Sequence, residues 1–579
     1  MKKTGAELAL FALEQLGVRH TFGIPGVHNT ELYDQLNSSK QITPIMVTHE
    51  GGASFMADAV SRVSDSIGTL VVVPAAGLTH AASGIGEAFL DGIPMLVICG
   101  GVRNDLDFEF QLHQMDQHQF MKGLTKETFL IENHKDVIPF LYKAYEVAVS
   151  GEPGPVFVEL PVNIQLMTGD VPDMPAFEGL TSHIPALESD QIERAAALLK
   201  EAKRPTIFAG WGARFAQKML LDLAERLDAP VSTTLQGLAV FPSDHSLHTG
   251  MGFGPSAVPA AQSGFSETDC LIAIGTRFSE IPTGSFGITV PENLIHIDIN
   301  PKVISANYPA KVGLVGDAGA VLEGLLEALG NDTGAAMRDG KKIRNTIKTA
   351  KEAYRQEWYD HNAKGRVNPA RFFDGLRQVL PEDGIVVVDD GNHTFLAAEL
   401  MPITNPKGFI CPSDFNCMGY AVPAAIGAKL ANPEAEVVAI VGDGAFTMTC
   451  MEILTASRNG VGAVFYVFND GELSQISQAQ AIPYNRKPCT VLGGLELSGV
   501  ALATGAHFLT MTGEHDPVDI SAEAAKVAKE GTPVIVDVQI DYSKKTAFTK
   551  GTVQTNFKRF PLGTKIRFLG RSLSRHITG

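Results

Sequence analysis

Short apolar runs alternate with longer, periodic stretches along the whole chain. Within the runs almost every position is apolar, which is typical of strands buried on both faces of a parallel sheet. The stretches between them repeat apolar positions every three or four residues, as amphipathic helices do. This alternation predicts α/β domains with parallel sheets. We expect the main strands at 20–24, 68–73, 95–99, 156–159, 206–209, 270–274, 294–297, 385–388, 437–441, 464–468 and 534–538.

The apolar runs fall into three groups. A link rich in Pro, Asp and Glu at 171–178 closes the first group, and a charged, helical stretch at 339–362 joins the second to the third. A chain of 579 residues has room for about three or four domains. The first and third groups are alike in size, but no short internal repeat is present. We predict three doubly wound α/β domains with mainly parallel sheets, at 1–180, 185–345 and 365–541, and a basic C-terminal extension at 542–579.

Composition and charge narrow the class of protein. Hydrophobic residues make up 45% of the chain and charged residues 19%, as in globular proteins with large cores. The net charge of −17 argues against nucleic acid as a partner. We see no uncharged apolar run of about 18 residues, and Glu7 and Glu14 suit an amphipathic helix better than a signal peptide. Six cysteines without CxxC spacing fit reduced thiols, so we expect a cytoplasmic protein with no membrane partner.

The C-terminal extension differs from the acidic body. Residues 542–579 contain nine Lys and Arg residues and no Asp or Glu. Apolar residues are spaced among the charges, which favours docking on an acidic surface of the protein's own oligomer. A disordered arm that binds an anionic partner is the alternative. The apolar anchors are Phe548, Phe557, Phe560, Ile566, Phe568 and Leu569.

Candidate metal ligands follow two neighbouring strands. Gly442-Asp443-Gly444 comes directly after the run at 437–441, and Asn469-Asp470 follows the run at 464–468. The residues at 449–458 between them have a helical pattern. Ligands of open α/β sheets bind at the carboxyl ends of strands, where oxygen side chains suit Mg²⁺ and glycines let the backbone approach a diphosphate. The alternative is that Asp443 only caps a helix.

This motif is similar to the thiamine diphosphate (ThDP) fingerprint, Gly-Asp-Gly followed by Asn-Asn, with Asp470 in place of the second Asn. Further motifs stand in the order of the acetolactate synthase and 2-oxo acid decarboxylase family. The resemblance covers about residues 1–541 and implies a pyrimidine-binding domain, a central domain and a diphosphate-binding domain. The motifs that carry it are at 22–26, 49–53, 154–156, 204–205, 210–212, 274–278, 296–298, 390–393 and 418–428.

The resemblance also implies the roles of individual residues. Glu50 would bond the cofactor's aminopyrimidine ring and promote loss of the proton at the reactive carbon, although a glutamate at a helix N-terminus is also favourable on its own. Met418 would support the bend of the cofactor. Asp443, Asp470 and the backbone carbonyl of Glu472 would hold the metal. The cofactor-binding set is Gly26, Gly391, Asn392, His393, Met418, Gly442, Asp443, Gly444, Ala445, Asn469, Gln475 and Ile476.

The substrate side is implied less directly. His28, His113 and Gln114 resemble groups that face the reacting carbons in related enzymes, and donors there would orient a 2-oxo acid carboxylate. A surface loop is the alternative for each. His80 also departs from the family, in which an Asn is common at this position.

Two further departures bear on the reaction. Ile476 stands where related pyruvate decarboxylases carry an acid that helps to release an aldehyde, so the sequence favours carboligation of a 2-oxo acid such as pyruvate with a second carbonyl compound. Ala479 stands where the anabolic synthases carry a large Trp, so we expect the acceptor side to be wider or differently shaped. The alternatives are a non-ligating 2-oxo acid decarboxylase and a non-catalytic binding module.

The resemblance makes ThDP and Mg²⁺ the expected cofactors. FAD is left open, and we expect its absence because 277–281 only partly resembles the FAD-binding segment of anabolic synthases. We expect a homodimer at minimum, and a homotetramer as the full assembly.

Overall fold

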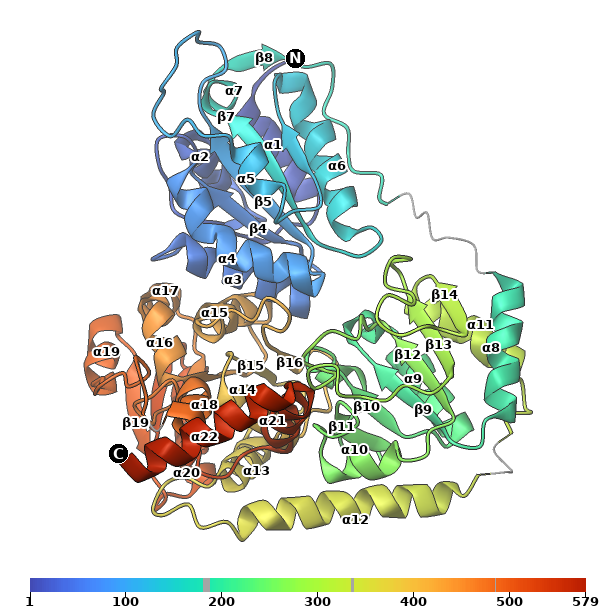
Figure 1. Cartoon of the computed structure of the whole chain (residues 1–579). Coiled ribbons are helices and arrows are strands. Elements are labelled where there is room, and N and C mark those ends of the chain that lie inside the picture. Colours follow the sequence, from blue (N-terminus) through green and yellow to red (C-terminus); the bar gives the residue numbers. More distant parts are fainter. Residues whose placement is uncertain (181–187, 335–337, 485, 579) are drawn as a thin grey trace.

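The computed structural model describes residues 1–180, 188–334, 338–484 and 486–578. It contains three units, each built on a six-stranded parallel sheet, which confirms the predicted fold class. In Figure 1 the first unit lies above the other two, the central unit is green, and the third unit is orange. The predicted start of the central domain, residue 185, lies outside the described residues. Across the described ranges, no helix combines the length and apolar character needed to cross a membrane.

The first sheet has the strand order β3-β2-β4-β5-β7-β6. Strands β1 (Lys2–Thr4) and β8 (Thr168–Asp170) form a separate antiparallel pair. The parallel strands are β2 (His20–Gly23), β3 (Thr43–Met46), β4 (Gly68–Val72), β5 (Met95–Gly101), β6 (Thr128–Leu130) and β7 (Pro155–Pro161). The helices are α1 (Gly5–Gln15), α2 (Thr30–Ser38), α3 (Glu50–Val63), α4 (Ala76–Asp91), α5 (Gln117–Met121), α6 (Val137–Val149) and α7 (Val162–Leu166).

The second sheet has the order β11-β10-β9-β12-β13-β14. Its strands are β9 (Pro205–Ala209), β10 (Val231–Thr233), β11 (His248–Met251), β12 (Cys270–Ile274), β13 (Asn293–Asp298) and β14 (Val312–Val315). Its helices are α8 (Ser189–Glu201), α9 (Gln217–Leu227), α10 (Pro259–Gly264) and α11 (Ala318–Leu329). Helix α12 (Gly340–Tyr359) then runs beneath the second and third units in Figure 1 and joins them, as the charged linker predicts.

The third sheet has the order β16-β15-β17-β18-β20-β19. The predicted helix at 449–458 is longer than expected, because the chain is already helical at Asp443 and passes through a 3₁₀ turn at Cys450–Glu452. Its strands are β15 (Ile385–Val388), β16 (Phe409–Ile410), β17 (Val437–Gly442), β18 (Val464–Phe468), β19 (His507–Met511) and β20 (Val534–Val538). Its helices are α13 (Pro369–Val379), α14 (Asn392–Leu400), α15 (Ala421–Ala431), α16 (Asp443–Thr449), α17 (Ile453–Arg458), α18 (Ser474–Tyr484), α19 (Leu497–Thr504) and α20 (Pro517–Lys529).

The first and third units share a hydrophobic core along α3 and α15. Close approach of the two helices depends on Gly427, where an added Cβ would come within 2.4 Å of the Met56 carbonyl oxygen. Inside this contact the buried Arg62 guanidinium bonds Asp58 at 2.6 Å and Asp91 at 2.9 Å. A buried charge needs such partners, and the Tyr420 hydroxyl of the third unit donates to Asp58 at 2.6 Å, so the network also ties the two units together.

The basic extension forms two helices, α21 (Ala547–Arg559) and α22 (Leu562–Thr578), which cross the third unit in Figure 1. The Phe548 ring stacks on Phe395 with centroids 4.0 Å apart. At the other end of α21, the Arg559 guanidinium donates to carbonyl oxygens of Ser285 and Phe286 in the central unit. Helix α22 packs against α18. The described part of the extension is therefore docked on the body through Phe548 and Arg559.

Candidate functional site

Asp443 and Asp470 lie at the carboxyl ends of adjacent parallel strands. Gly442 of β17 pairs in register with Phe468 of β18, so both strands end at the same level. The Asp443 carboxylate accepts hydrogen bonds from the backbone N–H groups of Gly471 at 2.7 Å and Gly444 at 2.8 Å. Burial raises the pKa of Asp443 and, although a hydrogen bond from Ser474 opposes it, raises the pKa of Asp470 to about 6. A divalent cation would favour the ionised form of both carboxyls.

These carboxyls line a cavity of about 560 Å³ at this edge of the sheet. The cavity brings together most of the predicted cofactor and metal residues. They are Gly391, Asn392, His393, Met418, Gly442, Asp443, Gly444, Ala445, Asp470, Glu472, Gln475 and Ile476. Five further residues that we did not single out as cofactor or metal ligands line it as well: Asp390, Phe468, Leu473, Ser474 and Tyr542.

The cavity has the properties of a diphosphate and metal site. His393 is 3% exposed, its Nε2 has no hydrogen-bond partner among the described residues, and burial lowers its pKa to about 3. Asp390 also has a buried Oδ1 without such a partner. Gly442 leaves room beside the His393 ring, because an added Cβ would lie 3.0 Å from Cε1 of that ring. Gly391 has a φ of +151°, a backbone conformation that favours glycine. The residues fit ThDP and Mg²⁺, because polar atoms without partners and a cradle free of side chains are both present.

The loops around the cavity are fixed by other residues. The buried Asp389 carboxylate accepts from Gly419 N at 2.9 Å and Ala421 N at 2.7 Å, which holds the loop that carries Met418. The Glu472 carboxylate bonds Lys487 and the Ser477 hydroxyl, the latter at 2.7 Å. The Glu472 side chain is therefore already paired, which fits a metal contact through its backbone carbonyl.

Asn469 lies apart from the rest of the predicted set. It does not line the cavity, and its side-chain amide donates to Asp537 at 3.1 Å. Tyr542, which does line the cavity, was not predicted. Strand β20 lies beside β18, so residues after β20 reach the same edge of the sheet as Asp470. That adjacency is the signal that would have pointed to Tyr542.

Glu50 begins α3 in the first unit. Helix α3 is capped by His49, whose Nδ1 accepts from Gly51 N at 3.0 Å. Glu50 is 8% exposed, and its Oε2 lies 3.0 Å from Nδ1 of His80. Glu452 of the third unit accepts from His49 N at 2.9 Å. The segment that presents Glu50 is thus held by both units, through His80 and Glu452, neither of which was predicted as a site residue.

The predicted substrate residues also belong to the first unit. The rings of His28 and His113 lie 5.1 Å apart, and neither Nδ1 has a partner among the described residues. Burial lowers the pKa of His28, and the nearby His113 lowers it further. Gln114 is exposed and accepts from Gln111 N at 2.9 Å, so no described contact joins it to the two histidines. Gly26 lies against Val73, which an added Cβ would approach to 2.7 Å.

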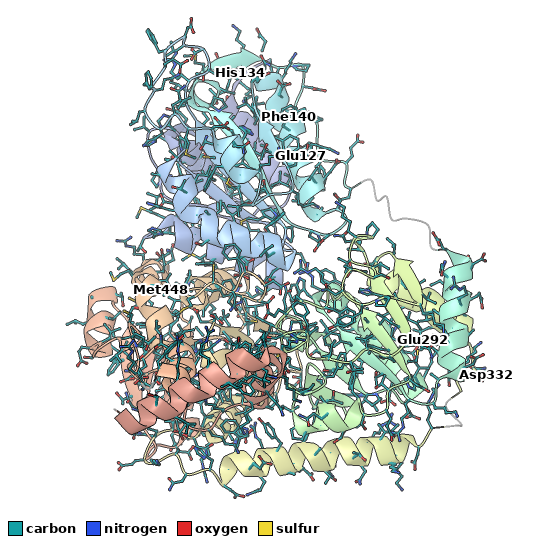
Figure 2. The ribbon with its side chains drawn as sticks, in the orientation of Figure 1. Glu127, His134, Phe140, Glu292, Asp332 and Met448 are labelled. Carbon is teal, nitrogen blue, oxygen red and sulfur yellow. The ribbon has the colours of Figure 1, made fainter. Side chains whose placement is uncertain are left out.

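Within one chain the two halves of the predicted site are separate. All residues that line the cavity lie between Asp390 and Tyr542, so Glu50 and His28 do not reach it. Large apolar side chains are exposed on both halves: Val27 is 71% exposed, Ile476 51%, and Met448, labelled in Figure 2, 57%.

A second crevice of about 660 Å³ opens at the carboxyl ends of the strands of the central unit. It includes Arg277, from the segment at 277–281 that bears on whether FAD binds. Its only described arginine or lysine is Arg277, which already pairs with Glu152 at 3.2 Å and Asp414 at 2.6 Å. Asp298 and Asp91 add two more carboxyls to the lining. The diphosphate of a dinucleotide would meet an excess of negative charge, so these side chains do not fit FAD well.

Comparison with known proteins agrees with this geometry. The chain matches the thiamine pyrophosphate enzyme N-terminal TPP binding domain at 3–120, the central domain at 192–325 and the C-terminal TPP binding domain at 389–538. It is 33% identical to the probable acetolactate synthase large subunit of Methanocaldococcus jannaschii, over 93% of this chain and 92% of that protein. It is 30% identical to the acetolactate synthase isozyme 3 large subunit of Escherichia coli, over 93% of this chain and 95% of that protein.

Proposed function

This chain belongs to the acetolactate synthase family of ThDP-dependent enzymes, and from that premise we propose that it decarboxylates a 2-oxo acid such as pyruvate and ligates the acyl fragment to a second carbonyl compound. The observation that carries the proposal is the cavity at the ends of β17 and β18, with Asp443 and Asp470 side by side and glycines around them. Bound ThDP would supply the carbon nucleophile that this reaction needs. The residues of the chain would bind the cofactor, orient the substrate and keep water out of the site.

Different residues of the cavity would bind the metal, bind the diphosphate and support the bend of the cofactor. Asp443, Asp470 and the Glu472 carbonyl would hold Mg²⁺, the metal that we propose from the oxygen donors. Gly391, Asn392 and His393 would meet the diphosphate, with the neutral His393 ring donating from a nitrogen that has no described partner. Met418 would support the bend of the cofactor from the loop that Asp389 holds.

Glu50 would provide the carboxylate for the aminopyrimidine ring, and His28 and His113 would orient the substrate carboxylate. Because these residues do not line the cavity of their own chain, we propose that they complete the site of a second subunit, as a C₂ dimer would allow. The relatives above are named large subunits, which supports assembly. A homodimer is the minimum, and a homotetramer the full assembly that we propose.

Ile476 favours ligation over release of an aldehyde. It lines the cavity and is 51% exposed, and its side chain has no proton to transfer. The acidic crevice of the central unit supports an enzyme that needs no FAD. All six cysteines are free thiols, which supports a cytoplasmic location.

The test is product analysis. The purified protein is incubated with ThDP, Mg²⁺ and a panel of 2-oxo acids, and the products are sorted into ligated hydroxyketones and free aldehydes. We expect hydroxyketones to dominate. Aldehyde alone would indicate a simple decarboxylase, and no turnover of any 2-oxo acid would support a binding module.

A further inference from the structure

A cavity of about 900 Å³ that has no role in the proposed reaction lies between the central unit, α12 and the end of α14. It shares no lining residue with the cofactor cavity. Helix α14 starts beside the cofactor cavity at Asn392 and ends at this one with Leu400, about 12 Å further along its axis. The lining residues are Ser243, His248, Thr249, Gly250, Val258, Ala260, Ala350, Lys351, Glu352, Tyr354, Arg355, Ala398, Glu399, Leu400, Met401 and Pro402.

Lys351 brings to this cavity a charge that forms no ion pair among the described residues, although the nearby Asp244 favours it. Its ammonium donates to the Ser243 carbonyl at 2.9 Å and to His248 Nδ1 at 3.3 Å. No carboxylate lies within 4.0 Å of it among the described residues. Burial lowers its pKa to about 8, which shows the cost of keeping the charge there. An ammonium has three donors, so one is left for a further acceptor.

His248 adds a second donor. The residue is 6% exposed, and burial lowers its pKa well below the usual value, so the ring is neutral. Because Nδ1 accepts from Lys351, the ring proton is on Nε2. That nitrogen has no hydrogen-bond partner in the described parts of the chain. A buried donor without a partner is costly, and an acceptor in the cavity would remove that cost.

The other charged groups of the lining already have partners. The Arg355 guanidinium bonds Asp374 and the Leu400 carbonyl, the latter at 2.8 Å. The Glu399 carboxylate accepts from Tyr354 OH and from the N–H groups of Ala547 and Phe548, the last at 2.8 Å. Exposed Glu352 lies 3.9 Å from Lys348. The described lining therefore offers an acceptor one cation without an ion pair, Lys351, and one neutral donor, Nε2–H of His248.

We propose that this cavity is a binding site for an aliphatic monocarboxylate. The carboxylate group would meet the Lys351 ammonium, which His248 Nδ1 holds in place, and a short hydrocarbon chain would lie on the apolar lining. A dianion such as phosphate would place its second charge near Glu399 and Glu352, which disfavours it. The apolar lining is Val258, Ala260, Ala350, Leu400 and Met401.

Butanoate is the probe, and butanol is the uncharged control of the same chain length. Calorimetric titration of the full-length protein, loaded with ThDP and Mg²⁺, should show butanoate binding and none with butanol. Lys351→Met should weaken butanoate binding about tenfold or more, the loss expected for one charge-assisted hydrogen bond. Lys348→Met, on the same helix with a side chain 72% exposed, should leave it unchanged. Absence of butanoate binding to the native protein, or equal affinity in native protein and Lys351→Met, would overturn the proposal.

Two further variants separate this site from the active site. Lys351→Arg keeps the positive charge and should therefore still bind butanoate. If Lys351→Met loses butanoate affinity and Lys351→Arg retains it, the loss is due to the charge and not to misfolding. Asp443→Ala removes a proposed metal ligand and should still bind butanoate. If Asp443→Ala abolishes binding while Lys351→Met retains it, the probe sits in the active site and the cavity proposal is wrong.

Discussion

Nδ1 of His80 lies 3.0 Å from Oε2 of Glu50, at the start of α3. The His80 ring also stacks on His49, with centroids 4.6 Å apart, and His49 caps the same helix. Glu50 is thus held from two sides by residues of its own unit. A carboxylate that takes part in a reaction must be held in one position. His80, which stands where an Asn is common in the family, therefore bears on the proposed reaction because it holds Glu50.

The first prediction concerns Glu50 itself. Glu50→Gln keeps the shape of the side chain but removes the carboxylate that would promote deprotonation of the cofactor. Hydrogen–deuterium exchange at the reactive carbon of ThDP should slow about a hundredfold or more. ThDP affinity, measured separately by titration, should stay near that of the native protein. Exchange at the native rate would remove Glu50 from its proposed role.

His80 should act through Glu50. In His80→Ala the Glu50 carboxylate loses a partner, so exchange at the reactive carbon should slow by about three- to tenfold, a small effect because His80 is half exposed. His80→Asn, which restores a donor and the residue common in the family, should recover part of the rate. If both variants exchange at the native rate, the contact has no role in the reaction.

Asp443→Ala should abolish Mg²⁺-dependent retention of ThDP. Without a bridging cation, the diphosphate would face the Asp470 carboxylate directly. Equilibrium dialysis with and without Mg²⁺ measures the effect. Asn469→Ala is the matched control, because Asn469 neighbours Asp470 but bonds Asp537 outside the cavity, and it should retain the cofactor. Native affinity in Asp443→Ala would show that the metal site has been assigned wrongly.

Complementation tests the shared site. Mixed Glu50→Gln and Asp443→Ala chains should regain activity on subunit exchange, because a heterodimer then has one intact site of two. Either variant alone should stay inactive. Exchange is checked with differently tagged chains, and inactive heterodimers of confirmed composition would count against a site between subunits.

The extension should help to close the site. Helix α22 packs on α18, which carries Gln475 and Ile476 of the cavity lining. Ending the chain after Phe560 removes α22 and leaves the Phe548–Phe395 contact of α21 in place. Easier entry of water should raise the aldehyde fraction of the product or weaken ThDP binding, with the three sheets still folded by circular dichroism. Unchanged products, affinity and oligomeric state would leave only a role for the arm as a binding segment.

The sequence revealed most of the inner strands and missed the edge strands of each sheet, and it also missed the inner strand β10. All eleven predicted strands are present, among them β4, β12 and β17, which are buried throughout or nearly so and therefore read as continuous apolar runs. The outer strands were not predicted. Edge strands are short or mixed in polarity because one side has no neighbour, as β6 and β19 show.

The site residues, like the strands, were predicted in part from the sequence and found in part only in the structure. Sequence alone determined that Asp443 and Asp470 end neighbouring strands, because both follow apolar runs directly, and the structure places most of the cofactor set in one cavity. Only the tertiary structure decided that His80 meets Glu50, that Tyr542 reaches the cavity, and that Lys351 forms no ion pair with any described residue. These relationships join residues far apart in the chain, and local patterns of polarity carry no information about such packing.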